Sequence, residues 1–316
     1  MKRKNVIFGT GKVGKKAFSY MRKETGYEEI IFCDNDSQKW GGDVENVIVV
    51  SPDDLRKICE DEIRVVIAVA NYMYIDDIAS QLLEIGILED CINVYDSQNN
   101  EIRKFEEIYG QIDYSQDGEE SYLKQKFGDK KGVFVDVGAN HPFLYSNTFW
   151  ASKCGWKGIN IEPDETNYKK LCFFRPNDIN LQIGVGSSNG ILPYYRFSMC
   201  HQGNTFDKNR ALEVSKVVSE NFVEEQIEVK TLQTVFDEYG ITTVDILDID
   251  AEEMDFEVLQ GIDWDNVHIE CILVEQRANN LKEVLESKMC NFLAMKGYEP
   301  VNKYCRTVIY EKEEIK

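Results

Sequence analysis

The segment VFVDVGANHPFLYSNTFW, residues 133–150, begins as an apolar run and continues into a turn that contains one glycine. Asp136 comes two residues before Gly138, and Asn140 follows two residues after it. An apolar run that leads through a glycine turn toward a helix is how many α/β proteins build a nucleotide-binding site. VIFGTGKVGKKAF, residues 6–18, is a second segment of this kind. Two such segments predict two α/β units, each with its own glycine loop.

Strand-like and helix-like segments alternate in both halves of the chain. Runs such as RVVIAVA (64–70) and VDILDID (244–250) are short, apolar and rich in β-branched residues, which is typical of buried strands. Their alternation with helical segments predicts mostly parallel sheets with helices on both faces. We therefore predict an α/β chain of two tandem doubly wound domains. The first is a small Rossmann-like nucleotide-binding domain at 1–100, and a polar linker at 101–130 joins it to a larger domain at 131–316.

The composition argues against several classes of partner. The 56 acidic residues outnumber the 36 basic ones, and the net charge of −20 disfavours nucleic acid, whose phosphates need a concentrated basic surface. The chain starts directly with a predicted strand, and no apolar run approaches the roughly 20 residues of a membrane helix. The nine cysteines form no CxxC pair, which favours reduced thiols over a zinc site or a disulfide scaffold. We expect a cytoplasmic protein without a membrane span or a nucleic-acid partner.

The first glycine segment has the spacing of a dinucleotide-binding loop. Gly9, Gly11 and Gly14 match G-x-G-x-x-G between a predicted strand and a predicted helix, and Asp34 follows where a carboxylate could bind a ribose diol. Together with IIFCDNDSQKWG (30–41), this segment resembles the small nucleotide-sugar-binding domains found ahead of some sugar acyltransferases and other polysaccharide-modifying enzymes. Two interpretations stay open: a nucleotide site, or a packing scaffold in which the glycines only let helix and strand approach.

The second glycine segment suits a different cofactor. Gly138 is its only tight glycine, whereas a pyrophosphate cradle usually has several. Asp136 can accept hydrogen bonds from an ammonium group, and S-adenosylmethionine has such a group and no phosphate. Glu162 ends the next predicted strand, where a carboxylate can accept both hydroxyls of a ribose. An acid, a single-glycine turn and a second acid together favour S-adenosylmethionine over NAD.

Three motifs carry a resemblance to a known family. They are VDVGANHPFLYSNTFWASKCGWKGINIEPD (135–164), LQIGVGSSNG (181–190) and VDILDIDAEEMDFEVLQGIDW (244–264). In this order they resemble the FkbM family of S-adenosylmethionine-dependent methyltransferases. The resemblance implies a class I methyltransferase domain with a seven-stranded, mostly parallel sheet. Family members commonly carry IDVEG at the third motif, whereas this chain has Glu253 in place of the glycine, which adds an acid to that turn.

The predicted cofactor site combines residues from these motifs: Asp136, Gly138, Asn140, Ser146, Asn147, Glu162 and Ile183. Ser146 and Asn147 begin a predicted helix, where they could cap the helix, bind the carboxylate of the cofactor, or do both. Ile183 follows the third predicted strand, and its position alone places it near the adenine.

Methyl transfer to a hydroxyl depends on positioning and on a base that accepts the proton. Asp250 ends the fourth predicted strand, at the carboxyl edge where α/β proteins bind ligands, so it is a candidate base, substrate ligand or cation ligand. His201 lies in a polar loop that we expect on the substrate side, and it is the second candidate base; an ordinary loop histidine is the alternative. We predict structural roles for His141, His268 and Asp248.

Further acidic and polar residues are predicted around the acceptor. Glu252 and Glu275 would complete an acidic rim beside Asp250, and Asn204 and Thr205 are predicted to bind sugar hydroxyls. Three or four converging carboxylates could also bind Mg²⁺ through oxygen. A dispersed acidic face is the alternative, and the sequence assigns no metal ligands.

These features predict an S-adenosylmethionine-dependent O-methyltransferase that acts on a hydroxyl of a sugar, nucleotide sugar or glycan precursor. In this interpretation the N-terminal domain binds the nucleotide or carrier portion. Two other classes stay open: an NAD-dependent nucleotide-sugar oxidoreductase that uses the first glycine loop, and a non-catalytic nucleotide-sugar-binding protein. The sequence also leaves open N-methylation of a sugar amine and assembly into a homo-oligomer.

Overall fold

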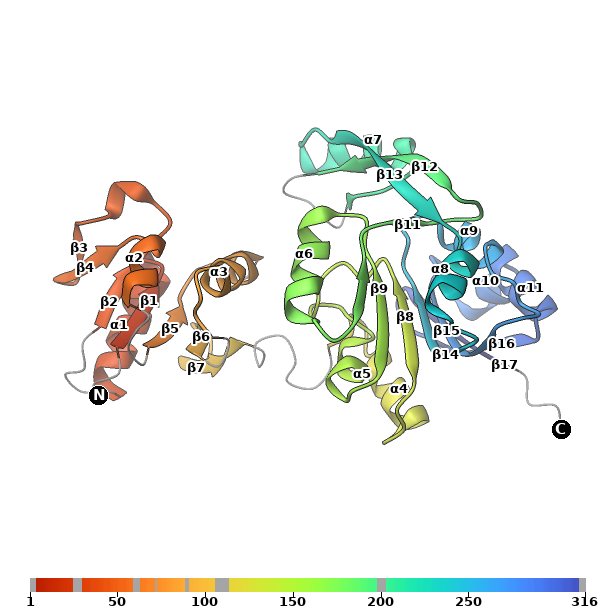
Figure 1. Cartoon of the computed structure of the whole chain (residues 1–316), viewed down its shortest axis with the longest axis horizontal. Helices are drawn as coiled ribbons and strands as arrows, with labels where there is room; N and C mark the ends of the chain where they lie inside the picture. The colour runs from red at the N-terminus through yellow and green to blue at the C-terminus, as the bar shows by residue number, and fades with distance from the viewer. Residues whose placement is uncertain are drawn as a thin grey trace. The chain divides into compact units, whose positions relative to one another are not determined.

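The structure of the chain, a computed structural model, describes residues 4–24, 30–58, 63–71, 73–88, 91–105, 114–197 and 203–312. The chain divides into two compact units, Met1–Gln111 and Ile112–Lys316, and each is described by itself. Each unit contains a seven-stranded sheet that is mostly parallel, so the predicted α/β architecture is confirmed (Figure 1).

The first unit has the strand order β3-β4-β2-β1-β5-β6-β7, with β1 at the centre. The five inner strands are parallel, and the two edge strands β3 and β7 are antiparallel to their neighbours. The strands are β1 (Lys4–Phe8), β2 (Ile30–Cys33), β3 (Asp43–Val44), β4 (Val47–Val50), β5 (Ile63–Ile67), β6 (Ile92–Asp96) and β7 (Glu101–Lys104). The helices are α1 (Lys12–Glu24), α2 (Pro52–Ile58) and α3 (Met73–Glu84), with the short 3₁₀ turn η1 (Ser37–Lys39).

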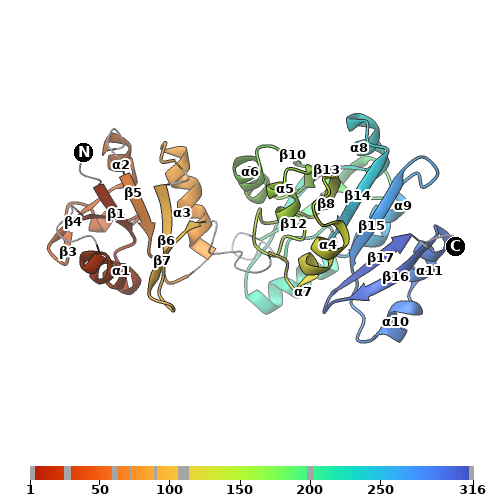
Figure 2. The same cartoon turned by 90° about the horizontal axis from the view of Figure 1, so that it is seen from below.

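The second unit has the strand order β10-β9-β8-β14-β15-β17-β16, and β17 is antiparallel to both of its neighbours. Figure 2 shows β14, β15, β17 and β16 following one another across the sheet. The strands of this sheet are β8 (Val133–Val137), β9 (Lys157–Ile161), β10 (Ile179–Leu181), β14 (Thr243–Ile249), β15 (His268–Glu275), β16 (Tyr298–Lys303) and β17 (Thr307–Lys312).

Helices cover both faces of this sheet because its central strands are apolar on both sides. One face packs Phe134 and Ile246 against α4 (Glu119–Phe127) and α5 (Phe149–Lys153). The other face packs Val135 and Leu247 against α8 (Leu232–Tyr239), α9 (Asp255–Gln260) and α11 (Lys288–Met295). The remaining helices of the unit are α6 (Glu165–Phe174), α7 (Lys208–Val218) and α10 (Leu281–Leu285).

Short polar side chains set where several of these helices begin. Asp164 caps α6 by accepting a hydrogen bond from the amide of Asn167, and Thr231 caps α8 in the same way through Thr234. Such caps satisfy amides that have no partner within the helix, and each stabilises a helix by about 1 kcal/mol. The cap of α6 also fixes the position of the chain just after β9.

A three-stranded sheet lies above the carboxyl edge of the large sheet (Figure 1). Its strands are β11 (Gly184–Val185), β12 (Gly190–Arg196) and β13 (Val223–Lys230), and β13 pairs with the other two. Tyr195 forms an isolated bridge with Thr205, which draws the segment before α7 toward the same edge.

Two parts of the segment 101–130, predicted to be a linker, belong to the sheets and helices of the two units. Residues 101–104 form β7 of the first sheet, antiparallel to β6. Residues 119–127 form α4, and its Leu123 and Phe127 are buried against Phe134 of the second unit. The difference arises because a few apolar residues in a polar stretch are enough to dock a short edge strand and a covering helix.

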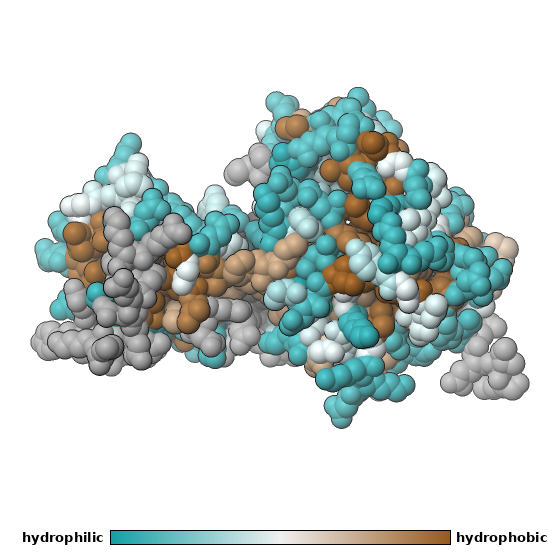
Figure 3. Space-filling view, in the orientation of Figure 1, coloured by the Kyte–Doolittle hydropathy of each residue, from teal (hydrophilic) through white to brown (hydrophobic). Residues whose placement is uncertain are grey.

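None of the helices in the described ranges has the length and apolar composition that a membrane crossing needs. Hydrophilic residues dominate the visible face of the second unit, and apolar residues appear there as separate patches (Figure 3).

Close packing explains two of the three glycines in the first loop. A Cβ on Gly14 would lie 1.9 Å from the carbonyl oxygen of Gly9, and a Cβ on Gly9 would lie 2.6 Å from that of Ala68. A Cβ on Gly11 would meet no atom within 4 Å. Gly9 and Gly14 are therefore required by the fold, whereas Gly11 is not.

This contrast gives a matched pair of variants. We expect Gly14→Ala to lower the free energy of unfolding of the first unit by about 1–3 kcal/mol or more, because the clash is with backbone that cannot move aside. Gly11→Ala should change it by less than about 0.5 kcal/mol. Hydrogen exchange of the β1 and β5 amides would measure both effects in that unit. Equal protection in the two variants would contradict the assignment.

Candidate active site

A cleft opens at the carboxyl edge of the second sheet, under the three-stranded sheet. Its position beside the point where the strand order reverses, between β8 and β14, is where α/β sheets bind ligands. The wall combines apolar and polar side chains. They include Val137, Gly138, Asn140, Ile161, Glu162, Asn167, Ile183, Val185, Tyr194, Asn204, Thr205, Phe206, Asp250 and Glu252.

The two loops that follow β8 and β14 touch at Gly138. This residue has φ +81°, and a Cβ on it would lie 1.8 Å from the carbonyl oxygen of Asp250. The amide of Asp250 donates to the carbonyl of Val137 at 2.9 Å, so the two chains are also hydrogen-bonded. Only glycine allows this approach, and it sets the distance between the two halves of the cleft.

Glu162 forms one end of the cleft and is fixed by backbone amides. Its Oε2 accepts from the amide of Asn140 at 2.7 Å, and its Oε1 accepts from that of Asp164 at 2.7 Å. Burial raises the pKa of Glu162 to about 8, although the hydrogen bond from Asp164 acts in the opposite direction. Asn140 has φ +48° and accepts from the side chain of Asn167 at 2.7 Å, so the loop is fixed beside the carboxylate.

Asp250 forms the other end of the cleft. Its carboxylate has no hydrogen-bond or ion-pair partner among the residues that the structure describes. The residue is exposed, and the cleft wall shields its carboxylate from part of the bulk water. Removal from bulk water, followed by repulsion from Glu275 and Glu252, raises the pKa of Asp250 well above its usual range. An unpartnered carboxylate of this kind is able to accept a proton from a neighbouring hydroxyl.

The turn after Asp250 contains two residues in the left-handed region. Glu252 has φ +44° and Glu253 has φ +78°, the latter at the position where the family resemblance expects glycine. Arg277 forms ion pairs with Glu253 at 3.1 Å and with Glu252 at 3.7 Å. Burial, then the charge of Glu275, raises the pKa of Glu252 to about 7. Because Arg277 is half exposed, these ion pairs stabilise the turn only weakly.

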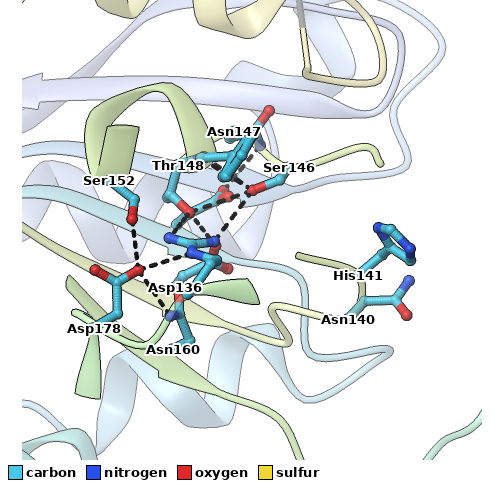
Figure 4. A network of polar contacts seen from close by, with 12 residues as sticks. Asp136, Asn140, His141, Ser146, Asn147, Thr148, Ser152, Asn160 and Asp178 are labelled. Carbon is cyan, nitrogen blue, oxygen red and sulfur yellow. Dashed lines mark hydrogen bonds and ion pairs between the residues drawn. The ribbon is translucent and has the colours of Figure 1, made fainter. Parts of the chain in front are cut away.

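Asp136 lies in a buried polar network and does not line the cleft. Thr148 donates to its Oδ2 at 2.5 Å, and the guanidinium of Arg175 lies 3.9 Å from the same oxygen. Arg175 also donates to Asp178 at 2.8 Å. Figure 4 shows this network, with Asn140 lying to one side of it. Asp136 occupies the same register as Asp248 on β14, so both point to the face covered by α4 and α5.

Ser146 and Asn147 also lie in the network and are not among the residues that line the cleft. Ser146 Oγ accepts from the amide of Phe149 at 3.2 Å, which is the capping role at the start of α5. Asn147 Nδ2 donates to Asp248 Oδ1 at 3.2 Å. The side chains turn inward because the buried acids and Arg175 supply partners there.

Asn204 and Thr205 line the cleft, and both also support its wall. Asn204 Oδ1 accepts from the amide of Phe197 at 2.7 Å, and Thr205 Oγ1 donates to the carbonyl of Glu252 at 3.2 Å. Ile183 lines the cleft on its apolar side. Glu275 lies behind the wall, where Arg277 approaches it at 3.8 Å.

The three histidines differ in position. His201 lies outside the described residues. His141 is buried, and its Nδ1 accepts from the amides of Phe143 and Leu144 at 3.1 and 2.9 Å, a structural role. His268 is exposed at the start of β15, at the edge opposite the cleft, beside Glu270.

In the first unit, Asp34 already has partners. Its Oδ2 accepts from the amide of Thr10 at 2.9 Å and from the hydroxyl of Thr10 at 2.5 Å, and Lys39 lies 3.2 Å away. Asp34 therefore closes the first glycine loop onto β2. A ribose would have to replace the Thr10 hydroxyl.

No group of three or more histidine, cysteine, aspartate or glutamate residues is arranged to hold a metal ion within the described ranges.

Sequence reasoning missed three residues that shape the site: Asn167, Tyr194 and Arg175. Asn167 had a local signal, because it lies three residues after the capping Asp164 and so faces the preceding loop. Tyr194 lies on β12, whose place over the cleft depends on the pairing of β12 with β13. Arg175 is near Asp178 in sequence, but its other partners, Thr148 and Asp136, lie on distant elements and gave no local signal.

Both parts of the chain match families of known proteins. Residues 136–300 match the family model of the methyltransferase FkbM domain, and residues 1–93 match that of the C2185-like N-terminal domain. A search of curated proteins found no match. A crystal structure of methyltransferase FkbM from Methylobacillus flagellatus aligns with 98% of this chain and 89% of its own, with a TM-score of 0.37 and 14% sequence identity.

The contact between Gly138 and Asp250 can be tested with a second glycine of the same backbone conformation. Gly155 has φ +80°, but a Cβ there would meet only the flexible end of Lys131 at 3.3 Å. We expect Gly155→Ala to lower the free energy of unfolding of the second unit by about 1–2 kcal/mol through backbone strain alone. Gly138→Ala should lower it by about 1–3 kcal/mol more, because its Cβ meets backbone. Denaturant unfolding measures both, and equal losses would contradict the contact.

Proposed function

Because this chain belongs to the FkbM methyltransferase family, as the match over residues 136–300 shows, we propose that it methylates a hydroxyl of a sugar, nucleotide sugar or glycan precursor. The observation that carries the proposal is one cleft with two different acids. Glu162 is held by backbone amides at one end, and Asp250 has no partner among the described residues at the other.

The residues of the cleft suit S-adenosylmethionine, which supplies an electrophilic methyl group when it is bound. Each oxygen of Glu162 accepts one amide hydrogen bond and keeps a lone pair for a ribose hydroxyl. Ile161, Ile183 and Val185 provide the apolar wall that an adenine ring needs. The loop has the single tight glycine Gly138 and no phosphate cradle. Asp136 would act on the cofactor through the loop, since it does not line the cleft.

Asp250 is the proposed base. Methyl transfer to a hydroxyl releases one proton, and the carboxylate of Asp250, which lines the cleft without a partner among the described residues, is able to take it. Its raised pKa makes it a stronger base than an ordinary aspartate, and also means that it is protonated and inactive at low pH. Asn204 and Thr205 would orient the acceptor only through polar atoms that their own wall contacts leave free.

The sugar class and the role of the first unit rest on resemblance and on two features of the first glycine loop. Gly11 has open space around it, and Trp40 is exposed beside Asp34, to whose carbonyl its indole donates at 2.7 Å. Backbone access at Gly11 and an aromatic surface at Trp40 suit the phosphate and the base of a nucleotide sugar. We include this binding role in the proposal.

Calorimetric titration of the full chain with S-adenosylmethionine, NAD and a nucleotide sugar tests the proposal directly. Micromolar binding of S-adenosylmethionine, followed by methylation of a sugar hydroxyl, is the expected outcome. Binding of NAD without S-adenosylmethionine would favour an oxidoreductase instead. Binding without turnover on any hydroxyl acceptor would favour a non-catalytic role.

We expect the affinity for S-adenosylmethionine to rise with pH between about 6 and 8. Glu162 must be ionised to accept two ribose hydroxyls, and with a pKa of about 8 its ionised fraction falls about tenfold for each pH unit below that value. Titration of wild type and Glu162→Gln across this range measures the effect. The variant should bind more weakly and lose this part of the pH dependence. An equal slope in both proteins would contradict the role of Glu162.

Replacing Asp250 should separate binding from chemistry. We expect Asp250→Asn to lower kcat by about 10²–10⁴-fold, because the amide cannot accept the proton. The Kd for S-adenosylmethionine should change by less than about threefold, a free-energy change below roughly 0.7 kcal/mol. Asp265→Asn, which removes an exposed acid outside the cleft, is the control. A variant that keeps wild-type kcat would eliminate Asp250 as the base.

A further inference from the structure

Arg175 is the largest side chain that is fully buried in the described part of the chain, with 2% of the residue exposed. Burying a guanidinium is expensive unless all of its hydrogen-bond donors and its charge are satisfied. The residue is the C-cap of α6, and it lies directly over the ring of Phe134 at 5.1 Å. The groups that contact this buried guanidinium are therefore held in place, because losing them would leave a buried charge without partners.

Its contacts come from three separate parts of the second unit. Nε donates to Asp178 at 2.8 Å, Nη2 donates to Thr148 Oγ1 at 3.1 Å, and Nη1 lies 3.5 Å from Ser146 Oγ. Nη1 also lies 3.9 Å from Asp136 Oδ2. Asp178 is held in turn by Ser152 and Asn160. The planar fork of arginine matches this set of acceptors, and lysine cannot contact all of them at once.

These contacts fix both ends of one loop. Asp136 lies at the end of β8 and Thr148 lies just before α5, and the Thr148 hydroxyl donates to Asp136 while it accepts from Arg175. The segment between them, 137–147, contains Gly138 and Asn140 of the cleft wall. Figure 4 shows Asp136, Ser146 and Thr148 converging on the same network, with Asn140 apart from it.

Residues at the two ends of helix α6 therefore both contact this loop. At its start, Asn167 donates to the side chain of Asn140 on the cleft side. After its last turn, Arg175 holds Thr148 and Ser146 on the buried side. A shift of the C-terminal anchor would move the loop that carries Gly138 against Glu162 and Asp250.

We propose that Arg175 is a positioning residue for the cofactor loop 137–147, acting through Thr148 and without contact with the cofactor. The inference rests on the proposed binding of S-adenosylmethionine in the cleft. It also explains why the acid of the first motif, Asp136, points away from the cleft: it completes the anchor.

The test compares hydroxyls of the same network in the full chain. Thr148→Val removes the hydroxyl that links Arg175 to the loop while keeping the volume, and Ser152→Ala removes one that contacts only Asp178. We expect the Kd for S-adenosylmethionine, measured by calorimetry, to rise about tenfold or more in Thr148→Val and in Arg175→Lys, because a misplaced loop loses its aligned contacts. In Ser152→Ala it should stay within about twofold of wild type, a change below roughly 0.4 kcal/mol.

A double variant decides whether the two residues act through one link. Arg175→Lys with Thr148→Val should raise Kd no more than the larger single change, since residues that act through one contact are not additive. Additive effects, unchanged affinity in Thr148→Val, or an equal loss in Ser152→Ala would overturn the proposal. Thermal unfolding checks that each variant is folded. If Arg175→Lys does not fold, Thr148→Val and Ser152→Ala still test the proposal.

The outcome is distinct from a failure of the proposed function. Wild type that binds no S-adenosylmethionine would refute the proposed function itself. Wild-type binding with unaffected variants would refute only the role of Arg175. Lys126 on α4 forms ion pairs with Glu270 on β15 and Glu311 on β17. Lys126→Gln therefore controls for the loss of a partly buried ion pair elsewhere in the unit.

Discussion

The approach of the Gly138 backbone to the carbonyl of Asp250 is the constraint on which the rest of the site depends. It joins the loops after two adjacent parallel strands, β8 and β14, at the point where the strand order reverses. Glu162 is bound to the first loop through Asn140, and Asp250, the proposed base, lies at the start of the second. Because the contact is between backbone atoms, the spacing of the two acids is set by the sheet and hardly at all by side-chain rotamers. A site of this kind is preorganised before any ligand enters.

The second unit uses the same chemical group in three ways, and the partners of each carboxylate decide which. Asp178 is buried with a guanidinium and serves as an anchor. Glu162 accepts two backbone amides and still presents lone pairs to the cleft. For Asp250, removal from bulk water and then repulsion from neighbouring acids raise the pKa, and no described residue donates a hydrogen bond to its carboxylate. In a chain with a net charge of −20, counting acids says little about function, whereas counting the donors around each acid distinguishes a structural group from a reactive one.

The alternation of strands and helices was sufficient to predict two sheets, and the parallel carboxyl ends were sufficient to bring Gly138, Glu162 and Asp250 together. The direction of Asp136 could not be predicted, because it depends on Arg175, which is near it only after α6 has packed. The choice between capping and binding at Ser146 was undetermined for the same reason. The predicted linker contains β7 and α4, since docking of short segments depends on surfaces that composition alone does not reveal. Local patterns thus specified backbone positions, while the orientation of buried polar side chains required partners distant in sequence.

The two glycine loops separate the requirements of a fold from those of a ligand. In the first loop, Gly9 and Gly14 are needed for packing, and Asp34 is already satisfied by Thr10. In the second, Gly138 is needed for packing as well, so a glycine motif by itself indicates close backbone approach in both units. What differs is the remaining capacity for hydrogen bonds. Glu162 and Asp250 keep acceptor positions open on the wall of a cleft, where a ligand can reach them. That unfilled capacity, more than the glycine spacing, is the physical reason to place the reactive cofactor in the second unit.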